Sequence, residues 1–419
     1  MNKNELHMGY SYVMLLGLAC AMLTTVAGIN IFVLLLLLAT PWFWRGFALE
    51  ASQKTKTLQF LGLIFGICAW DVVTNLLAGY GLVRSLVAMQ HDLRTFGFIL
   101  VLWAMFSVVK VARFALFVLM GAFVAIATAN LLATMGGVIK PGEYLWYTMH
   151  HLYGQMIVGF IFLLAQMLLV RPDLSWRAAI PMLALLASMF FASERRAGIL
   201  LLVAGLPLWV LLNHKRFSIG RYRWWLAAAA VAVVVGAMNS SIVQTRMMIA
   251  VQEIQNFIQR DPIERANDFS SVGLRLQFYV SIWELIKAHW VLGVGSIQFA
   301  DLFQQINLAM GTTEPQRFTN PHNEYLFILA TKGVVGLLLY VGIFVQACRL
   351  AWDKQDEVQR NGLIMFVYLF MVSIFMNSMM VDMEEGHFTM LILLMFLAPY
   401  KLNLFEFKKS VEFKTKDVQ

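Results

Sequence analysis

The sequence predicts an all-α, polytopic membrane protein, and three observations carry this prediction. Hydrophobic residues make up 60% of the 419 residues and charged residues only 13%, whereas an average soluble domain is about 25% charged. Apolar runs such as Tyr10–Val26 and Ile29–Trp44 approach or reach the ~17–25 residues that a spanning helix needs. These runs are continuous and do not alternate with a period of two, which excludes a membrane β-barrel.

About twelve spans are expected, nine of them within residues 1–238 and three within 334–400. The first apolar run has no small-residue cleavage site and another run follows at once, so it is expected to stay as a span. The spans centre on 10–26, 29–45, 59–77, 95–109, 112–132, 153–170, 178–192, 197–212, 224–238, 334–350, 363–380 and 388–400.

The Lys and Arg residues of the short loops gather on one side of this arrangement, together with those of the tail 401–419. By the positive-inside rule that side is cytoplasmic. Both termini are therefore expected in the cytoplasm. The one large loop, residues 239–333, is then expected on the outer face of the membrane.

Within the large loop, Met247–Gln259 and Leu276–Trp290 carry apolar residues at helical spacing and are expected to be surface helices. Gly293 and Gly295 should form a turn after the second helix. The segment Asn323–Lys332 is too polar at its end to span, so it should be an interfacial helix that bends at Gly333 into the tenth span. An apolar face is expected on the second helix, made by Leu276, Tyr279, Val280, Trp283 and Ile286.

Outside this loop, Gly79–Arg94 is polar enough to be an interfacial connection. The three cysteines, Cys20, Cys68 and Cys348, lie in apolar runs and offer neither a disulfide framework nor a zinc site. The net charge of +8 is spread among the spans. This favours lipid headgroups and anionic lipid-linked substrates as partners and gives no nucleic-acid surface.

Several arginines are expected on the outer face, against the positive-inside bias. The guanidinium group matches phosphate oxygens bidentately and stays charged, so a cluster of arginines could hold a pyrophosphate without a metal. Pairing with Asp261, Glu264 and Asp268 or with lipid headgroups is the alternative for each of them. They are Arg195, Arg196, Arg246, Arg260, Arg265 and Arg275.

His322 lies between Pro321 and Asn323 at the start of the interfacial helix. Imidazole titrates near neutral pH, so it suits a general base that takes a proton from an attacking hydroxyl. A surface or capping role is the alternative. The acidic turn Asp382–His387 matches no trusted metal-ligand spacing. Asp71, within the third span, should face the bundle interior and pair with a polar neighbour.

These motifs resemble the O-antigen ligase family. The family pattern of His-Asn, nine residues and Gly-x-x-Gly appears as His322-Asn323, then Gly333-Val-Val-Gly336. Arg275, Trp283 and the Gly293-Val-Gly295 turn are similar to a second family feature. A third, an Arg followed by small residues at the outer end of a span, matches Arg196-Ala-Gly198, with Arg195 as the neighbouring candidate.

The resemblance implies a GT-C-like glycosyltransferase in the bacterial inner membrane, with its active site on the periplasmic face. It would transfer O-antigen from undecaprenyl pyrophosphate to a sugar hydroxyl of lipid A-core, with inversion and without a metal or other cofactor. His322, Arg275 and Arg196 would be catalytic. The substrate-binding residues around the pyrophosphate would be Arg195, Arg265, Asn323 and Tyr325.

Three other functions stay open from the sequence. A protein O-oligosaccharyltransferase or an O-antigen polymerase would use the same lipid-linked donor. The short outer segment Gly136–His151 disfavours a polymerase, which tends to have two large outer loops. A flippase for lipid-linked oligosaccharides would need a polar cavity through the bundle, and the spans offer little beyond Asp71.

Overall fold

The computed structural model describes residues 13, 17, 54–106, 109–140, 152–170, 175–191, 196–217, 241–313, 320–354, 356–380 and 383–397. Over these residues the chain is helical and contains no strand. The expected spans 29–45 and 224–238 and the tail 401–419 lie outside the described residues, as does the span 10–26 apart from residues 13 and 17. The helices preceding the large loop are α3 (Lys54–Leu77), α4 (Leu82–Phe106), α5 (Val109–Met135), α6 (Leu152–Val170), α7 (Ser175–Phe191), α8 (Arg196–Leu212) and α9 (His214–Phe217).

The large loop is itself mostly helical. Its helices are α11 (Ser241–Gln259), α12 (Pro262–Ala266), α13 (Ser271–His289) and α14 (Phe299–Ala309), and the chain then returns to the bundle through α15 (Glu324–Trp352), α16 (Glu357–Ser373) and α17 (Met383–Leu397). Side chains start these helices: Asp261 accepts from the amides of Ile263 and Glu264, and Ser270 accepts from that of Gly273.

Three of the described helical segments are long and apolar enough to cross a membrane, namely Lys54–Leu77, Val118–Met135 and Glu324–Trp352. Shorter apolar segments lie at Gly154–Val170, Ala179–Met189 and Gly198–Leu212. Over the described residues the chain is therefore all-helical, with three segments that are long and apolar enough to cross a membrane. The count of about twelve spans stays a prediction.

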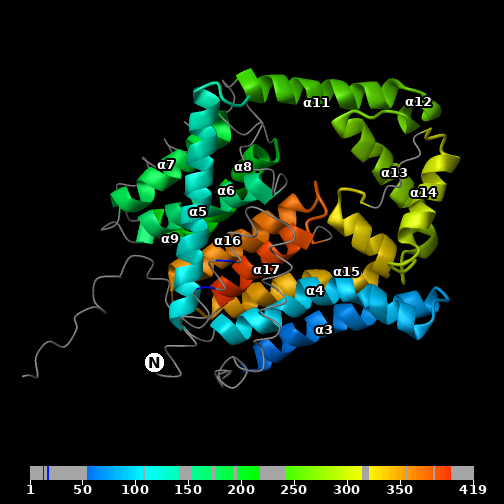
Figure 1. Ribbon diagram of the computed structural model, residues 1–419, viewed down its shortest axis with the longest axis horizontal. Helices are drawn as coiled ribbons and strands as arrows, with labels where there is room; N and C mark the ends of the chain where they lie inside the picture. Colours follow the sequence, from blue (N-terminus) through cyan, green and yellow to red (C-terminus); the bar gives the residue numbers. More distant parts are fainter. Residues whose placement is uncertain are drawn as a thin grey trace, which may run out of the picture.

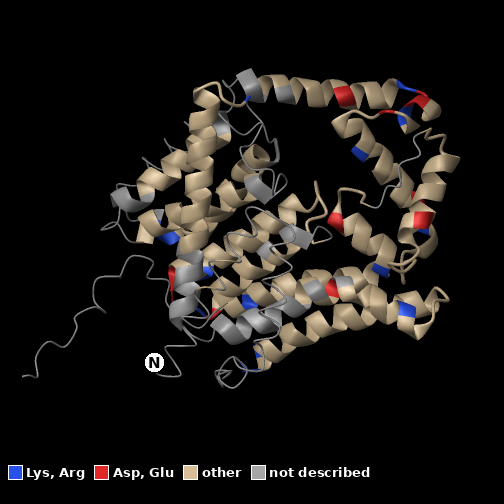
Figure 2. Cartoon of the chain, in the orientation of Figure 1, with Lys and Arg blue, Asp and Glu red and all other residues tan. Residues whose placement is uncertain are grey.

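The bundle helices share one hydrophobic core. It includes the fully buried rings of Phe60, Phe123, Tyr340, Phe344 and Phe370. In Figure 1, α3 lies beside α15, and α4 lies beside α3 and α17. The helices α16 and α17 are central, and α5 to α8 form the opposite side. Charged residues are sparse along these helices and gather where α11 meets α12 (Figure 2).

The helices of the large loop have a smaller core of their own. Phe278 and Ile282 of α13 pack with Phe299 and Phe303 of α14, and Ala330 of α15 closes this cluster. Figure 1 shows α11 running along the outer edge of the molecule, from the side of α5 and α8 to α12. Because α13 also packs against α15, the large loop is joined directly to the bundle.

One expectation from the sequence, the connection at Gly79–Arg94, is wrong. Residues 82–94 belong to α4, so Gly79–Arg94 is a connection only as far as Gly81. The expected apolar face of α13 is only partly covered by the rest of the protein: Val280 and Trp283 are 46% and 50% exposed, whereas Ile286 is buried. The buried face carries Phe278, Ile282 and Leu285 as well as Ile286, because those residues meet α14 and α15.

The break of α15 at Gly333 was expected and is confirmed. Gly333 has φ 65° and ψ −170°, so the helix consists of two segments that meet there. This conformation lies in a region that only glycine occupies readily. The Leu292–Gly295 turn was also expected, and Gly293 and Gly295 both have positive φ.

Candidate active site

His322 has an unusual backbone conformation. Its φ of 54° is the only positive value of a non-glycine residue among the described residues. The amide of His322 donates to Oδ1 of Asn320 at 2.8 Å, and Tyr279 Oη lies 3.4 Å from its carbonyl oxygen. Histidine tolerates the left-handed region better than most residues do, but a residue stays there only when its surroundings hold it. These contacts therefore fix where the imidazole leaves the chain.

The imidazole of His322 is half-buried against α13. Its ring lies nearly parallel to that of Phe278, with 6.3 Å between the ring centroids and 15° between the planes. Burial lowers the pKa of His322 from its ordinary value of 6.5, and the positive charge of Arg275 lowers it further. At neutral pH the ring is therefore mainly neutral and able to accept a proton.

Tyr279 joins His322 and Arg275 into one group. Burial raises the pKa of Tyr279, while a hydrogen bond with the Asn323 side chain and the charge of Arg275 act against this rise. The hydroxyl of Tyr279 donates to the carbonyl of Phe375 at 3.1 Å. The loop helix α13, the start of α15 and the end of α16 thus meet around His322.

Asn323 and Tyr325, which the sequence suggested for substrate binding, have partners in the protein. The Asn323 side chain caps α15 by accepting from the amide of Leu326 at 3.1 Å. The hydroxyl of Tyr325 donates to the carbonyl of Met371 at 2.8 Å, and its ring packs on Phe375. Both residues hold the start of α15 in place.

Glu324 adds two further bonds between the start of α15 and the segment after α16. The Glu324 amide donates to the carbonyl of Ile374 at 2.9 Å. Its buried carboxylate accepts from the amide of Met380 at 3.1 Å. The expected span 363–380 ends as a helix at Ser373, and the residues that follow Ser373 supply these contacts.

The predicted arginines are only partly brought together. Arg275 lies close enough to His322 and Tyr279 to shift the pKa values of both. Arg265 instead contacts α11: its Nη2 donates to the carbonyl of Ile258 at 2.7 Å, and its guanidinium lies 5.8 Å from the ring centroid of Phe257. Arg196 begins α8, but its side chain, like Arg195, lies outside the described part of the chain.

Arg260 follows the alternative that the sequence left open. It pairs with the buried carboxylate of Asp268 at 2.8 Å. Asp268 also accepts from the amide of Ser270 at 3.0 Å, so this pair braces the approach to α13. Asp382 lies outside the described residues, and within the described part no group of three or more His, Cys, Asp or Glu is placed to hold a metal ion.

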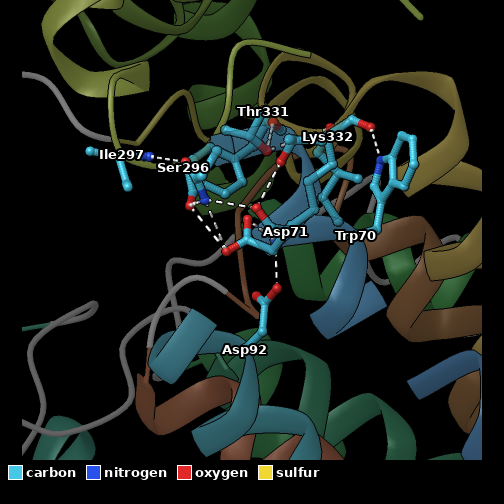
Figure 3. Close-up of polar contacts among 11 residues, drawn as sticks. Trp70, Asp71, Asp92, Ser296, Ile297, Thr331 and Lys332 are labelled. Atoms are coloured by element: carbon cyan, nitrogen blue, oxygen red, sulfur yellow. Dashed lines mark hydrogen bonds and ion pairs between the residues drawn. The ribbon is translucent and has the colours of Figure 1, made fainter. Parts of the chain in front are cut away.

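A buried ion group that the sequence predicted only in part lies at the other end of the first α15 segment. The ammonium of Lys332 is 2.9 Å from Asp71 Oδ1 and 2.6 Å from Asp92 Oδ2 (Figure 3). The expectation that Asp71 pairs inside the bundle is confirmed. Asp92 was missed because Gly79–Arg94 looked like a connection, and Lys332 because its charge was taken as a sign of the membrane border.

One cavity in the described part of the chain lies away from His322. A cavity of about 350 Å³ lies between the end of α3 and the α13–α14 turn, at the other end of α13 from Arg275. Its lining includes Thr74, His289, Trp290 and Gln298. Chemically, the His322 group is the richer one, because it combines a neutral imidazole, a guanidinium and a phenol.

The segment that carries this group also matches a known family. Residues 181–341 match the family model described as O-Antigen ligase. The matched range begins in α7, includes the whole large loop and ends in α15. A search of curated proteins found no match to the chain. The match over residues 181–341 agrees with the motif resemblance and supports membership of the O-antigen ligase family.

Proposed function

We propose that the protein is an O-antigen ligase, which transfers O-antigen from undecaprenyl pyrophosphate to a sugar hydroxyl of lipid A-core. Its family comprises membrane enzymes of the glycosyltransferase kind that act on lipid-linked glycans. The observation that carries the proposal is the meeting of His322 and Arg275 inside the matched segment. These two residues are far apart in the sequence and supply a base and an anion-binding group.

The donor's pyrophosphate is the leaving group in this reaction. As the bond between the anomeric carbon and the phosphate oxygen breaks, the electron pair stays with the pyrophosphate. Arg275 would stabilise that charge with a bidentate grip, helped by Arg196 and with Arg195 and Arg265 as further cations. Asn323 and Tyr325 would support the site through the start of α15, where their polar atoms are bonded.

The acceptor is a sugar hydroxyl of lipid A-core. His322 would take the proton of this hydroxyl while its oxygen forms the new bond to the anomeric carbon, from the face opposite the leaving pyrophosphate. One displacement of this kind inverts the anomeric configuration. A positioned base typically contributes roughly 10²–10⁴-fold to the rate. Atoms and charge balance without a cofactor, and we propose a metal-independent reaction.

The proposed location is the bacterial inner membrane, with both termini in the cytoplasm. Residues 1–238 and 334–400 would hold the spans, 401–419 a cytoplasmic tail, and 239–333 the periplasmic loop with the reacting groups. The loop Lys and Arg bias supports this orientation. The periplasm lacks nucleotide-sugar donors, so a donor used there must carry the energy of transfer in its own pyrophosphate bond, as a lipid-linked donor does.

Reconstitution in proteoliposomes tests the function. The purified protein is given undecaprenyl-pyrophosphate glycan with lipid A-core, with a Ser/Thr peptide, or with no second acceptor, in the presence and absence of a chelator. We expect glycan on lipid A-core only, and no inhibition by the chelator.

The other outcomes identify the competing functions. Glycan on the peptide would indicate a protein O-oligosaccharyltransferase, and longer lipid-linked glycan would indicate a polymerase. Movement of the donor across the bilayer without transfer would indicate a flippase. Inhibition that Mg²⁺ reverses would contradict the metal-independent reaction and direct attention to Asp382–His387.

A further inference from the structure

The break in α15 leaves backbone groups that another part of the chain satisfies. In an unbroken helix, the carbonyls of Ala330 and Thr331 would accept from amides four residues further on. Here the amide of Val294 donates to the carbonyl of Ala330 at 2.8 Å, and that of Gly295 to the carbonyl of Thr331 at 2.9 Å. The amide of Val334 donates to the carbonyl of Trp290 at 2.9 Å. The α13–α14 turn therefore replaces the missing bonds of α15.

This exchange needs very close backbone approach. A Cβ on Gly293 would collide with the Thr331 carbonyl, and a Cβ on Gly333 with the Val291 carbonyl. Both glycines also have positive φ, a backbone conformation that residues with a side chain rarely adopt. The turn and the break are thus fitted to each other at the level of the backbone.

Lys332 is the last residue before the break, and α3 contacts both its side chain and its backbone carbonyl. Its side chain is 6% exposed and lies between Asp71 of α3 and Asp92 of α4. Its carbonyl accepts from the indole N–H of Trp70 at 2.7 Å. Figure 3 shows these groups around one point, with contributions from α3, α4 and α15.

The ion group is also connected to the α13–α14 turn. Oδ2 of Asp71 accepts from the hydroxyl of Ser296 at 3.2 Å. Asn75, one helical turn after Asp71, donates to Ser296 Oγ at 3.0 Å and accepts from the amide of Ile297 at 3.1 Å. Lys332 is therefore the point where α3, α4, α15 and the large loop are tied together.

We propose that Lys332, paired with Asp71 and Asp92, is a positioning residue that fixes His322 for glycosyl transfer; this inference rests on the proposed function. His322 stands at one end of the segment Glu324–Lys332 and the ion group at the other. At about 1.5 Å per residue, the segment is about 13 Å long. A tilt of about 10° at the break would move its far end by about 2 Å, and a misplacement of about 1 Å can cost about 10²-fold in rate.

The ion pair resists such a tilt because separation of its members would leave charges in an apolar surrounding. A buried charge without its partner is strongly unfavourable. The bonds of Glu324 and Tyr325 to the residues around the end of α16 hold the opposite end. Both ends of the segment are thereby fixed, and the position of His322, next to one of these ends, is fixed with them.

The test compares Lys332→Met with a matched control, Lys56→Met. Lys56 also ties α3 to α15, through Asp353 at 2.5 Å, but this pair is partly exposed and lies at the far end of α15. Transfer kinetics are measured per folded enzyme, and amide hydrogen exchange is measured on the same samples. For Lys332→Met we expect kcat to fall about 10²-fold, with the donor KM little changed and faster exchange confined to 321–332. Lys56→Met should match the wild type in both measurements.

Unchanged kcat and exchange in folded Lys332→Met would overturn the proposal. So would a loss of kcat accompanied by faster exchange throughout α6 to α8, because that would show a general loss of stability. If Lys332→Met does not accumulate in the membrane, a variant with Asp71→Asn and Asp92→Asn added replaces it, since it leaves no buried charge without a partner. The same two measurements then decide.

Amide hydrogen exchange is measured without substrate, so the proposed function and the positioning role of Lys332 can be contradicted independently. A wild-type protein that transfers no glycan would contradict the proposed function. Unchanged exchange on loss of the Lys332 charge would contradict the positioning role, whatever substrate the protein uses.

Discussion

At the scale of single residues, His322 combines two features that rarely occur together. Its backbone has a left-handed conformation, and its ring is half-buried between an aromatic ring and a positive charge. Both features carry a free-energy cost that surrounding contacts offset, here those of Asn320 and Tyr279. Such a cost is typical of residues whose position matters for chemistry.

Replacement of His322 should remove most of the activity. We expect His322→Ala to lower the rate of transfer by roughly 10²–10⁴-fold, the usual contribution of a positioned base. His289→Ala is the matched control because His289 is an exposed histidine in the last turn of α13. Rates are measured with reconstituted enzyme at equal folded concentration. Full activity of His322→Ala would exclude its role as the base.

The pH dependence should report the Arg275–His322 pair. Because the pKa of His322 is lowered, its neutral form persists below pH 6.5, and activity should fall only as the pH drops through the lowered pKa. Arg275→Gln removes one cause of the shift. Its residual activity, normalised to its own maximum, should therefore have an acidic limb at higher pH than that of the wild type. An unmoved limb would separate Arg275 from His322.

The sequence predicted which residues need a polar partner better than it predicted which residue that partner is. The charge of Asp71 inside a span demanded a partner, because an unpaired carboxylate in hydrocarbon is too unfavourable. The sequence could not say that the partner would be Lys332, which follows it by 261 positions. Likewise Arg265 was expected to join Arg275 around the pyrophosphate, yet local folding directs Arg265 to α11 and Arg275 to His322.

At the scale of elements, α15 is the helix on which the site depends. His322 lies two residues before its first segment, and Lys332 ends that segment. As a whole, α15 is long and apolar enough to cross a membrane. The break at Gly333 sets the angle at which the first segment meets α13. The site therefore depends on the backbone conformation of Gly333.

A side chain at position 333 should disturb both folding and function. Gly333→Ala places a Cβ against the Val291 carbonyl and requires a backbone conformation worth about 1–3 kcal/mol of strain for a non-glycine residue. We expect a lower Tm in detergent and a lower kcat. Gly62→Ala in α3 is the control, since a Cβ there meets nothing within 4 Å. Equal Tm values for the two variants would contradict the strain at Gly333.

Helix periodicity predicted the elements well where one face meets lipid or solvent and poorly where two faces are apolar. The break at Gly333 followed from a charged residue next to a glycine. On α13 the pattern selected the face of Val280 and Trp283, because it could not show that α14 would cover the face of Phe278. In α4, the polar residues before position 95 include Asp92, which faces Lys332 inside the protein.

At the scale of the whole molecule, the bundle holds the large loop against one of its ends. Hydropathy and charge could predict the order of the helices along the chain and the side of the membrane on which each loop lies. They could not predict which helices pack together. The apolar faces of these helices have similar compositions, so no pattern in the sequence distinguishes one packing partner from another. The contact of α3 with α15, for example, joins Trp70 to Lys332, which are 262 positions apart.

The orientation of the molecule gives a prediction of its own. In a background with Cys20, Cys68 and Cys348 replaced by alanine, single cysteines are placed at Lys287 of α13 and Lys215 after α8, which are both exposed. A membrane-impermeant maleimide added to intact spheroplasts should label Lys287→Cys and leave Lys215→Cys unlabelled. Labelling of Lys215→Cys alone would invert the proposed topology.

The backbone exchange between the α13–α14 turn and the break of α15 has a consequence for how the protein can be divided. A fragment of residues 239–333 would lose the amide of Val334 that donates to the Trp290 carbonyl and the indole of Trp70 that donates to the Lys332 carbonyl. Lys332 would also lose both of its carboxylate partners, which would stay behind in the bundle. Neither half is chemically complete without the other. The polypeptide must therefore reach its native state as one cooperative unit, and a soluble version of the loop is not to be expected.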